Sequence, residues 1–176
     1  MAETEPRALL TENEILARVD LLAARINRDY SDADDLLLIG VLRGAFIFLA
    51  DLARRLEVCH SIDFIALSSY ESGARSRGAV RLIMDVREDV AGRNILVVED
   101  IVDTGHTLAY LEKSLGARRP ASLKKCVLVS KTARHEIPPT IDYLGFEIPD
   151  VWVVGYGLDY ENRFRTLPYI GIFDGA

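Results

Sequence analysis

The stretch Val97-Val98-Glu99-Asp100-Ile101-Val102-Asp103-Thr104-Gly105-His106-Thr107 joins a predicted buried strand to a predicted helix. Residues 95–98 are continuously apolar, which is typical of a strand that is covered on both faces of its sheet. After the Asp103-Thr104-Gly105 turn, leucines recur at helical spacing as far as Gly116. A strand that leads directly into a helix predicts a unit of a parallel α/β sheet.

The rest of the chain repeats this alternation of strands and helices. Thr11 and Glu14 have the spacing of a capping box, which predicts the start of a helix that continues to about residue 28. We expect a second helix at 45–56 and further strands at 36–42, 61–69, 80–86, 126–130 and 151–156. Because the buried strands lack polar alternation, the predicted fold class is α/β, with a central, mainly parallel sheet flanked by helices.

One edge of this sheet is expected to carry both acids and cations. In open parallel sheets, ligands bind beyond the carboxyl ends of the strands. The polar residues that follow the predicted strands are Arg43, Glu99, Asp100, the turn from Asp103 to Thr107, Lys131, Asp159, Arg163 and Arg165. An anionic ligand would need such a local site, because the chain as a whole has a net charge of -6.

The turn from Asp103 to Thr107 has the features of a phosphate site. A helix N-terminus presents unpaired N–H groups and partial positive charge, and a glycine there allows close approach of a ligand. Glu99 and Asp100 would repel a phosphate, so they indicate a ligand that also offers ribose hydroxyls or Mg²⁺ with its waters. The alternative is a solvated acidic strand end, followed by an ordinary helix cap at Asp103.

Composition limits the other classes of function. Apolar residues make up 49% of the 176 residues, and we expect one folded domain over residues 1–176. The acidic balance argues against a nucleic-acid partner. We find neither a signal-peptide pattern nor an apolar run of membrane-spanning length, so we expect a cytoplasmic protein without a membrane partner. Cys59 and Cys126 are predicted to be reduced thiols in the core.

The string Glu-Asp-x-x-Asp-Thr-Gly-x-Thr, placed after an apolar strand, resembles the signature of the type I phosphoribosyltransferases, which bind phosphoribosyl pyrophosphate. Further segments resemble the hypoxanthine-guanine branch of that family, in particular its bacterial members, and they follow in the same order: 41–45, 63–70, 145–150 and 153–160. The resemblance extends from about residue 36 to residue 170. It implies the type I phosphoribosyltransferase fold, with a small hood formed by the chain ends.

The resemblance also implies roles for the residues around the phosphate turn. Ribose and its phosphate would be bound by Glu99, Asp100, Asp103, Thr104, Gly105, His106 and Thr107. Asp103 would be the catalytic acid–base near purine N7, a task that suits a carboxylate because it can accept a proton and stabilise positive charge on the sugar. His106 departs from members that have lysine at this position. Mg²⁺ is the implied cofactor, held by Glu99, Asp100 and Asp159.

Pyrophosphate, purine and lid are assigned to other segments by the same resemblance. Arg43, Gly44 and Arg165 would bind pyrophosphate, with a cis peptide between Leu42 and Arg43, and Lys131, Trp152, Val153 and Asp159 would bind the purine. An ammonium group only donates hydrogen bonds, so Lys131 would favour a 6-oxopurine over adenine. Ser69 and Tyr70 would belong to a lid that excludes water. The alternatives are a core position for Trp152 and a solvated surface position for Lys131, while Arg163 is expected to be a surface charge.

The implied reaction is transfer of 5-phosphoribose to N9 of hypoxanthine or guanine, which gives IMP or GMP and pyrophosphate in purine salvage. Three other hypotheses stay open at this point. The chain could be a regulator of the same fold that senses phosphoribosyl pyrophosphate or nucleotides, a flavodoxin-like nucleotide-binding module, or an enzyme with another acceptor base such as xanthine. By resemblance we expect a homodimer or a homotetramer.

Overall fold

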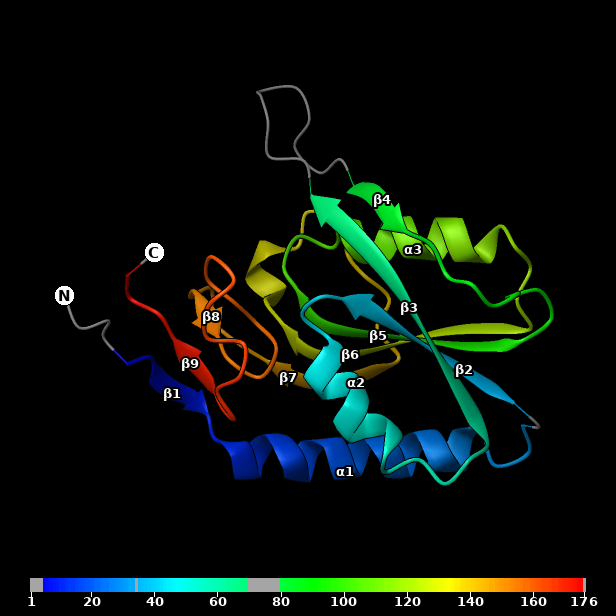
Figure 1. Cartoon of the computed structure of the whole chain (residues 1–176), viewed down its shortest axis with the longest axis horizontal. Coiled ribbons are helices and arrows are strands. Elements are labelled where there is room, and N and C mark those ends of the chain that lie inside the picture. Colours follow the sequence, from blue (N-terminus) through cyan, green and yellow to red (C-terminus); the bar gives the residue numbers. More distant parts are fainter. Residues whose placement is uncertain (1–4, 34, 70–79, 176) are drawn as a thin grey trace.

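A six-stranded sheet forms the centre of the structure (Figure 1). The structure is a computed structural model, and it describes residues 5–33, 35–69 and 80–175. The strand order is β4-β3-β2-β5-β6-β7, and every neighbouring pair is parallel except β3 with β4. The strands are β2 (Leu36–Leu42), β3 (His60–Ser69), β4 (Val80–Met84), β5 (Asn94–Val102), β6 (Ser122–Ser130) and β7 (Tyr143–Glu147). The predicted, mainly parallel α/β sheet is therefore confirmed.

Helices cover both faces of this sheet. α1 (Glu12–Asp29) and α2 (Phe46–Ala53) lie on one face, and α3 (His106–Gly116) lies on the other (Figure 1). The predicted capping box is present at the start of α1, where Thr11 N donates to Glu14 Oε2 at 2.8 Å and Glu14 N to Thr11 Oγ1 at 3.4 Å. None of the helices in the described ranges is long and apolar enough to span a membrane.

Two apolar cores result from this arrangement. Leu36 and Leu38 of β2 belong to the core beneath α1 and α2, whereas Leu37 and Ile39 belong to the core beneath α3. All four side chains are fully buried. Successive residues of a strand point to opposite faces, so a strand with helices on both faces must be apolar at every position. This requirement explains the continuous apolar runs in the sequence.

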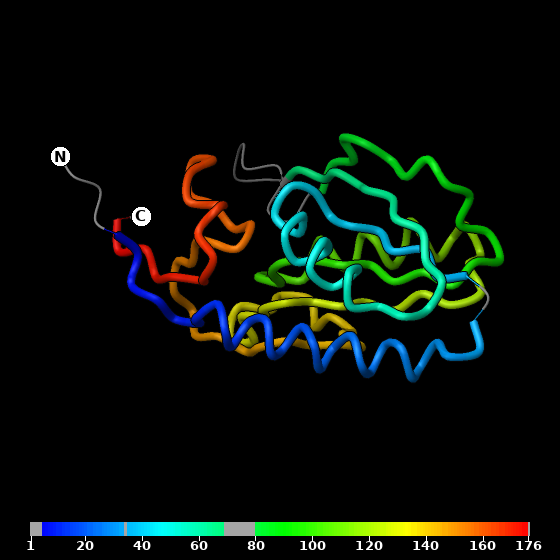
Figure 2. The backbone as a smooth tube through the Cα atoms, turned by 60° about the horizontal axis from the view of Figure 1, so that its bottom comes forward, coloured from blue at the N-terminus to red at the C-terminus, as the bar shows by residue number. Residues whose placement is uncertain are grey.

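A second, three-stranded sheet brings the two ends of the chain together. Its order is β1-β9-β8, with β1 (Arg7–Leu10), β8 (Val153–Val154) and β9 (Ile170–Ile172) paired antiparallel. Figure 2 shows the first and last described segments side by side at one end of the molecule. This hood, as the β1-β9-β8 sheet with its loops is called below, lies at the end of the sheet toward which β2 and β3 run (Figure 1).

The region after β6 differs from the sequence prediction. Residues 151–156 were expected to form a strand of the main sheet, but β8 covers only Val153–Val154 and pairs within the hood. Gly155 and Tyr156 adopt φ angles of +96° and +50°, which end the strand. The fifth parallel strand is β7, where Gly145 lies so close to β6 that a Cβ would be 2.3 Å from Leu128 O.

The two cysteines also differ from each other. Cys126 is fully buried in the core beneath α1 and α2, as predicted, and burial raises the pKa of its thiol. Cys59 is exposed, so its predicted core position is wrong. It lies in the connection from α2 to β3, one residue before β3 begins at His60, and is therefore outside the part of the strand that the helices cover.

Candidate active site

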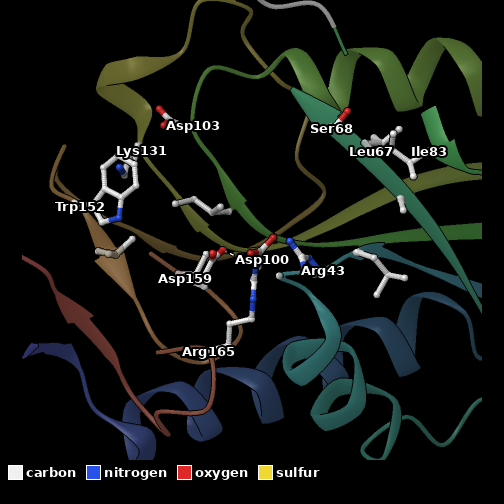
Figure 3. Close-up of a pocket in the computed structure, with 16 residues that line it drawn as sticks. Arg43, Leu67, Ser68, Ile83, Asp100, Asp103, Lys131, Trp152, Asp159 and Arg165 are labelled. Atoms are coloured by element: carbon white, nitrogen blue, oxygen red, sulfur yellow. Dashed lines mark ion pairs between the residues drawn. The ribbon is translucent and has the colours of Figure 1, made fainter. Parts of the chain in front are cut away.

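A pocket of about 760 Å³ lies between the carboxyl ends of the parallel strands and the hood (Figure 3). The main sheet and the segments that follow its strands supply Arg43, Gly44, Asp100, Asp103 and Lys131, and the hood supplies Trp152, Val153, Asp159 and Arg165. These residues are far apart in the sequence and were predicted to share one site. The apolar remainder of the lining, which sequence reasoning missed, includes Leu67, Ile83, Ile101 and Leu158.

The two acids of the signature lie inside β5 and not beyond its end. β5 was expected to stop at Val98, but its pairing with β6 continues through Glu99↔Val127 to Val102↔Ser130. Glu99 and Asp100 are each only 7% exposed. The alternative of a solvated strand end is therefore wrong.

Burial raises the pKa of both acids. It raises the pKa of Asp100 to about 6, and burial together with the charge of Asp100 raises the pKa of Glu99 well above its usual range. Glu99 Oε2 is buried and has no hydrogen-bond partner among the described residues. A buried carboxylate oxygen without a partner fits a ligand that brings hydroxyl donors or a cation.

The same two acids fit Mg²⁺ only in combination with a ligand. Carboxylate oxygens are suitable ligands for this cation, which usually binds through one or two carboxylates plus phosphates and waters. Within the described ranges, no three His, Cys, Asp or Glu residues gather into a ready metal site. The protein would therefore supply part of the coordination, and a bound phosphate compound the rest.

The predicted phosphate turn, residues 103–107, lies between β5 and α3. α3 begins at His106, and its N-cap residue is Gly105, with a φ of +89° and no side-chain cap. Asp103 is therefore not the helix cap, and that alternative is wrong. A Cβ at position 105 would lie 2.1 Å from Ile137 O, so only glycine fits there. His106 points to a carboxylate, with its Nε2 2.9 Å from Glu136 Oε2.

The expected pyrophosphate loop packs directly against Asp100 and the hood. The peptide between Leu42 and Arg43 is cis, as the resemblance implies. A Cβ on Gly44 would lie 1.7 Å from Asp100 Oδ2, and a Cβ on Gly157 would lie 1.9 Å from Gly44 O. The backbone at Gly44 is thus enclosed between the Asp100 carboxylate and the hood, where no side chain fits.

Arg165 and Asp159 form a fixed pair on the hood side of the pocket. Arg165 Nη2 lies 2.6 Å from Asp159 Oδ1, and Arg165 Nη1 donates to Gly157 O at 2.7 Å. Figure 3 shows Arg165 reaching from the hood toward Asp159 and Asp100. Arg163, by contrast, is not among the lining residues; its side chain is 47% exposed and its Nη2 lies 3.1 Å from Glu161 Oε2.

Lys131 and Trp152, two of the expected purine residues, lie beside each other in the pocket (Figure 3). Lys131 is 6% exposed, and its Nζ lies 3.9 Å from Asp150 Oδ1. Trp152 is 52% exposed, with its ring edge-on to Tyr160 at 5.9 Å between centroids. The alternatives of a surface lysine and a core tryptophan are therefore both wrong. Val153 is buried in β8 beside them.

One charged neighbour of this site had no signal in the sequence. Arg134 ends the short 3-10 turn η1 (Thr132–Arg134), and its Nε lies 2.6 Å from Asp103 Oδ1. It belongs to a polar run that resembles any exposed loop.

Of the two predicted lid residues, Ser69 ends β3 and Tyr70 lies outside the described residues, while Ser68 lines the pocket.

Comparison with known proteins identifies relatives over nearly the whole chain. The family model described as phosphoribosyl transferase domain matches residues 7–161. The chain is 44% identical to the hypoxanthine phosphoribosyltransferase of Escherichia coli strain K12 over 164 residues, which cover 93% of this chain and 92% of that protein. It is 46% identical to the hypoxanthine-guanine phosphoribosyltransferase of Mycobacterium tuberculosis over 171 residues, 94% of this chain and 85% of that protein.

Solved structures with the same fold include enzymes of the same kind. A hypoxanthine-guanine phosphoribosyltransferase from Bacillus anthracis, solved with a HEPES molecule in its active site, has a TM-score of 0.90 and 38% identity, covering 96% of this chain and 99% of that one. A ternary substrate complex of a mutant hypoxanthine phosphoribosyltransferase from Trypanosoma cruzi has a TM-score of 0.90 and 43% identity, with coverage of 96% and 95%.

Proposed function

The chain belongs to the phosphoribosyl transferase domain family, and from this premise we propose that it transfers 5-phosphoribose from phosphoribosyl pyrophosphate to hypoxanthine or guanine. The products are IMP or GMP and pyrophosphate, and the enzyme serves purine salvage. The observation that carries this proposal is the single pocket in which Asp100, Asp103 and Lys131 meet Trp152 and Arg165 of the hood. We also assign residues 1–176 to one domain, in the cytoplasm, that forms a homodimer or homotetramer.

The sugar phosphate is assigned to the β5–α3 side of the pocket. The ribose hydroxyls donate to the buried Glu99 and Asp100 carboxylates. These hydroxyls supply the hydrogen-bond partner that Glu99 Oε2 otherwise lacks. The 5′-phosphate lies at the turn formed by Thr104, Gly105, His106 and Thr107, at the N-terminus of α3. The pyrophosphate is bound by Arg43, the Gly44 backbone and Arg165.

The purine is assigned to the part of the pocket lined by Lys131 and Trp152. The Lys131 ammonium donates to O6, the Trp152 ring stacks on the base, and Val153 contacts its edge through the backbone. Asp103 lies between purine and ribose, where its carboxylate accepts the proton from N7 as the bond from N9 to the sugar carbon forms. Positive charge develops on the sugar in this step, and the Asp103 carboxylate stabilises it.

Mg²⁺ belongs to the proposal as the cofactor held by Glu99, Asp100 and Asp159. When bound, it neutralises the charge of the departing pyrophosphate. The contribution of this chain is to orient the leaving group with Arg43 and Arg165, and to exclude water with the hood and with the lid expected at Ser69 and Tyr70. Water must be excluded because it would otherwise attack the electron-poor sugar carbon.

Product formation tests the proposal directly. The protein is incubated with Mg²⁺, phosphoribosyl pyrophosphate and one base at a time, and IMP, GMP, XMP and AMP are separated by chromatography. We expect IMP and GMP, and little AMP because adenine has no acceptor for Lys131. Failure to form a nucleotide from any 6-oxopurine would contradict the function, and XMP as the main product would assign the enzyme to xanthine.

The other hypotheses receive less support. A regulator of the same fold would need a basic surface for nucleic acid, whereas the net charge is -6 and the relatives named above are enzymes. A flavodoxin-like module would not need Arg43, Lys131 and Arg165 to converge on one pocket from separate segments.

A further inference from the structure

The segment that follows β6 forms the back of the phosphate turn. Lys131 N donates to Val102 O at 2.9 Å, on one side of Asp103. Glu136 N and Ile137 N donate to Thr104 O at 3.0 and 3.1 Å, on its other side. The backbone on both sides of Asp103 is thus held by residues 131–137, while the Asp103 side chain itself is 41% exposed.

Arg134 lies at the centre of this segment, and its side chain reaches the Asp103 carboxylate. Its Nε lies 2.6 Å from Asp103 Oδ1, without the geometry of a hydrogen bond, and its Nη1 lies 3.4 Å from Asp150 Oδ1. Asp150 Oδ1 in turn lies 3.9 Å from Lys131 Nζ. Because Arg134 N also donates to Lys131 O at 2.9 Å, one short turn holds both Lys131 and Arg134.

We propose that Arg134 is a positioning residue that holds the Asp103 carboxylate toward purine N7, a role that rests on the proposed function. The guanidinium binds Oδ1 and leaves Oδ2 free for the base. Through Asp150 the same guanidinium is linked to Lys131, so the group that recognises O6 and the group that takes the N7 proton share one support. The side chains of Asp103, Arg134 and Asp150 are 41–51% exposed, so the ion pairs between them contribute little to the stability of the fold.

Position is the quantity that such a pair controls. A misplacement of about 1 Å in a catalytic group can reduce the rate roughly 100-fold. We therefore expect Arg134→Gln to lower kcat about 10- to 100-fold, while the KM for phosphoribosyl pyrophosphate changes less than about twofold, because Arg134 does not contact the sugar phosphate in this arrangement. Arg118→Gln is the matched control, because Arg118 does not line the pocket and its Nη2 lies 2.7 Å from Asp85 Oδ2. This control should leave kcat and the KM for phosphoribosyl pyrophosphate unchanged.

A double-mutant cycle with Asp103→Asn separates positioning from a general structural effect. If Arg134 acts through Asp103, Arg134→Gln should lower kcat less than about twofold once Asp103 has been replaced. An equal loss in both backgrounds, a kcat unchanged by Arg134→Gln alone, or a loss confined to KM would overturn the proposal. A radiolabelled base keeps low rates measurable, and circular dichroism checks folding. If Arg134→Gln does not fold, Arg134→Lys is used in the same cycle, because its single ammonium replaces the two guanidinium nitrogens that contact the two carboxylates.

The same assay separates the two levels of the proposal. If the wild-type chain forms no nucleotide, the proposed function and the role of Arg134 fail together. If it forms IMP or GMP and the cycle is additive, the function stands and only the role of Arg134 is wrong.

Discussion

At the scale of single residues, two buried lysines of this chain invite comparison. Lys125 is 3% exposed and its Nζ lies 3.0 Å from Glu112 Oε2, so its charge has a partner of its own. Lys131 is 6% exposed and faces the pocket, where the Asp150 carboxylate is 3.9 Å away. Keeping a charged group buried without close pairing costs free energy, which a functional site can justify when a ligand supplies the missing acceptor.

Lys131→Met should therefore lower kcat/KM for 6-oxopurines more than kcat/KM for adenine. Loss of a hydrogen bond from a charged donor to O6 should lower kcat/KM for hypoxanthine and guanine about 10- to 100-fold. Activity with adenine should change little, so the preference for hypoxanthine over adenine narrows. The measurement is kcat/KM for each base. Lys125→Met, which removes the other buried ammonium, should leave the ratio as it is, and an unchanged ratio in Lys131→Met would show that O6 is read by another group.

At the scale of elements, the sequence predicts best where one physical requirement decides the structure. β2 is found at the predicted residues, because a strand covered on both faces has to be apolar throughout. β7 escaped prediction because it is short, carries Gly145 and ends on Glu147 at the edge of the sheet. β5 was predicted too short, because Glu99 and Asp100 look like the end of a strand until their pairing with β6 is known.

The sequence also predicted some parts of the candidate site and not others. The predicted strand ends, although wrong for β5, together with the resemblance gave most of the polar residues that line the pocket. Contacts between segments could not be read in this way. The ion pair between Arg134 and Asp103 depends on how the turn after β6 packs against the turn after β5, and no local pattern of residues encodes that distance.

The connection from β4 to β5 depends on one carboxylate of β3. Asp63 Oδ2 accepts from Arg87 N at 2.6 Å and Glu88 N at 2.9 Å, and Oδ1 accepts from Phe64 N at 2.7 Å. Burial alone would raise the pKa of Asp63, but these three N–H donors outweigh it and lower the pKa. An asparagine has only one side-chain oxygen, so Asp63→Asn should reduce the free energy of unfolding at neutral pH by about 1–3 kcal/mol.

The pH dependence of this loss has a definite sign. Because the pKa of Asp63 is lower in the folded state, its contribution is complete above the unfolded-state value of about 3.9 and disappears as the pH falls through the folded-state value. Urea titrations of both proteins at a series of pH values should show curves that converge in acid. Asp89→Asn is the control, because among the described residues Asp89 accepts only from Ala91 N, at 3.0 Å, in the same connection. A difference that stays constant with pH would contradict the explanation.

At the scale of the whole molecule, the pocket exists only while the hood stays on the sheet. The hood is assembled from both ends of the described chain, and it supplies Trp152, Asp159 and Arg165 to the lining. Contacts with the segment after β2 and with α2 hold the hood loop that follows β8. Gly157 lies against Gly44, and the Tyr156 hydroxyl donates to Asp51 Oδ2 of α2 at 2.6 Å. Arg54 and Arg55 pair with the same aspartate, and Arg55 also pairs with Asp20 of α1.

Tyr156→Phe should therefore affect substrate binding at a distance. Tyr156 is 3% exposed, and removal of its hydroxyl leaves the Asp51 carboxylate without its buried donor, which should cost about 1.5–3 kcal/mol of stability. Because the loop that carries Val153 and Asp159 loses an anchor, the KM for purine should rise several-fold, whereas kcat should fall less. Tyr169→Phe is the matched control: its hydroxyl donates to Pro6 O at 3.1 Å within the hood, so it should destabilise the protein without raising that KM. Equal values of KM in the wild type and Tyr156→Phe would mean that Gly157 and the ion pair of Arg165 hold the loop by themselves.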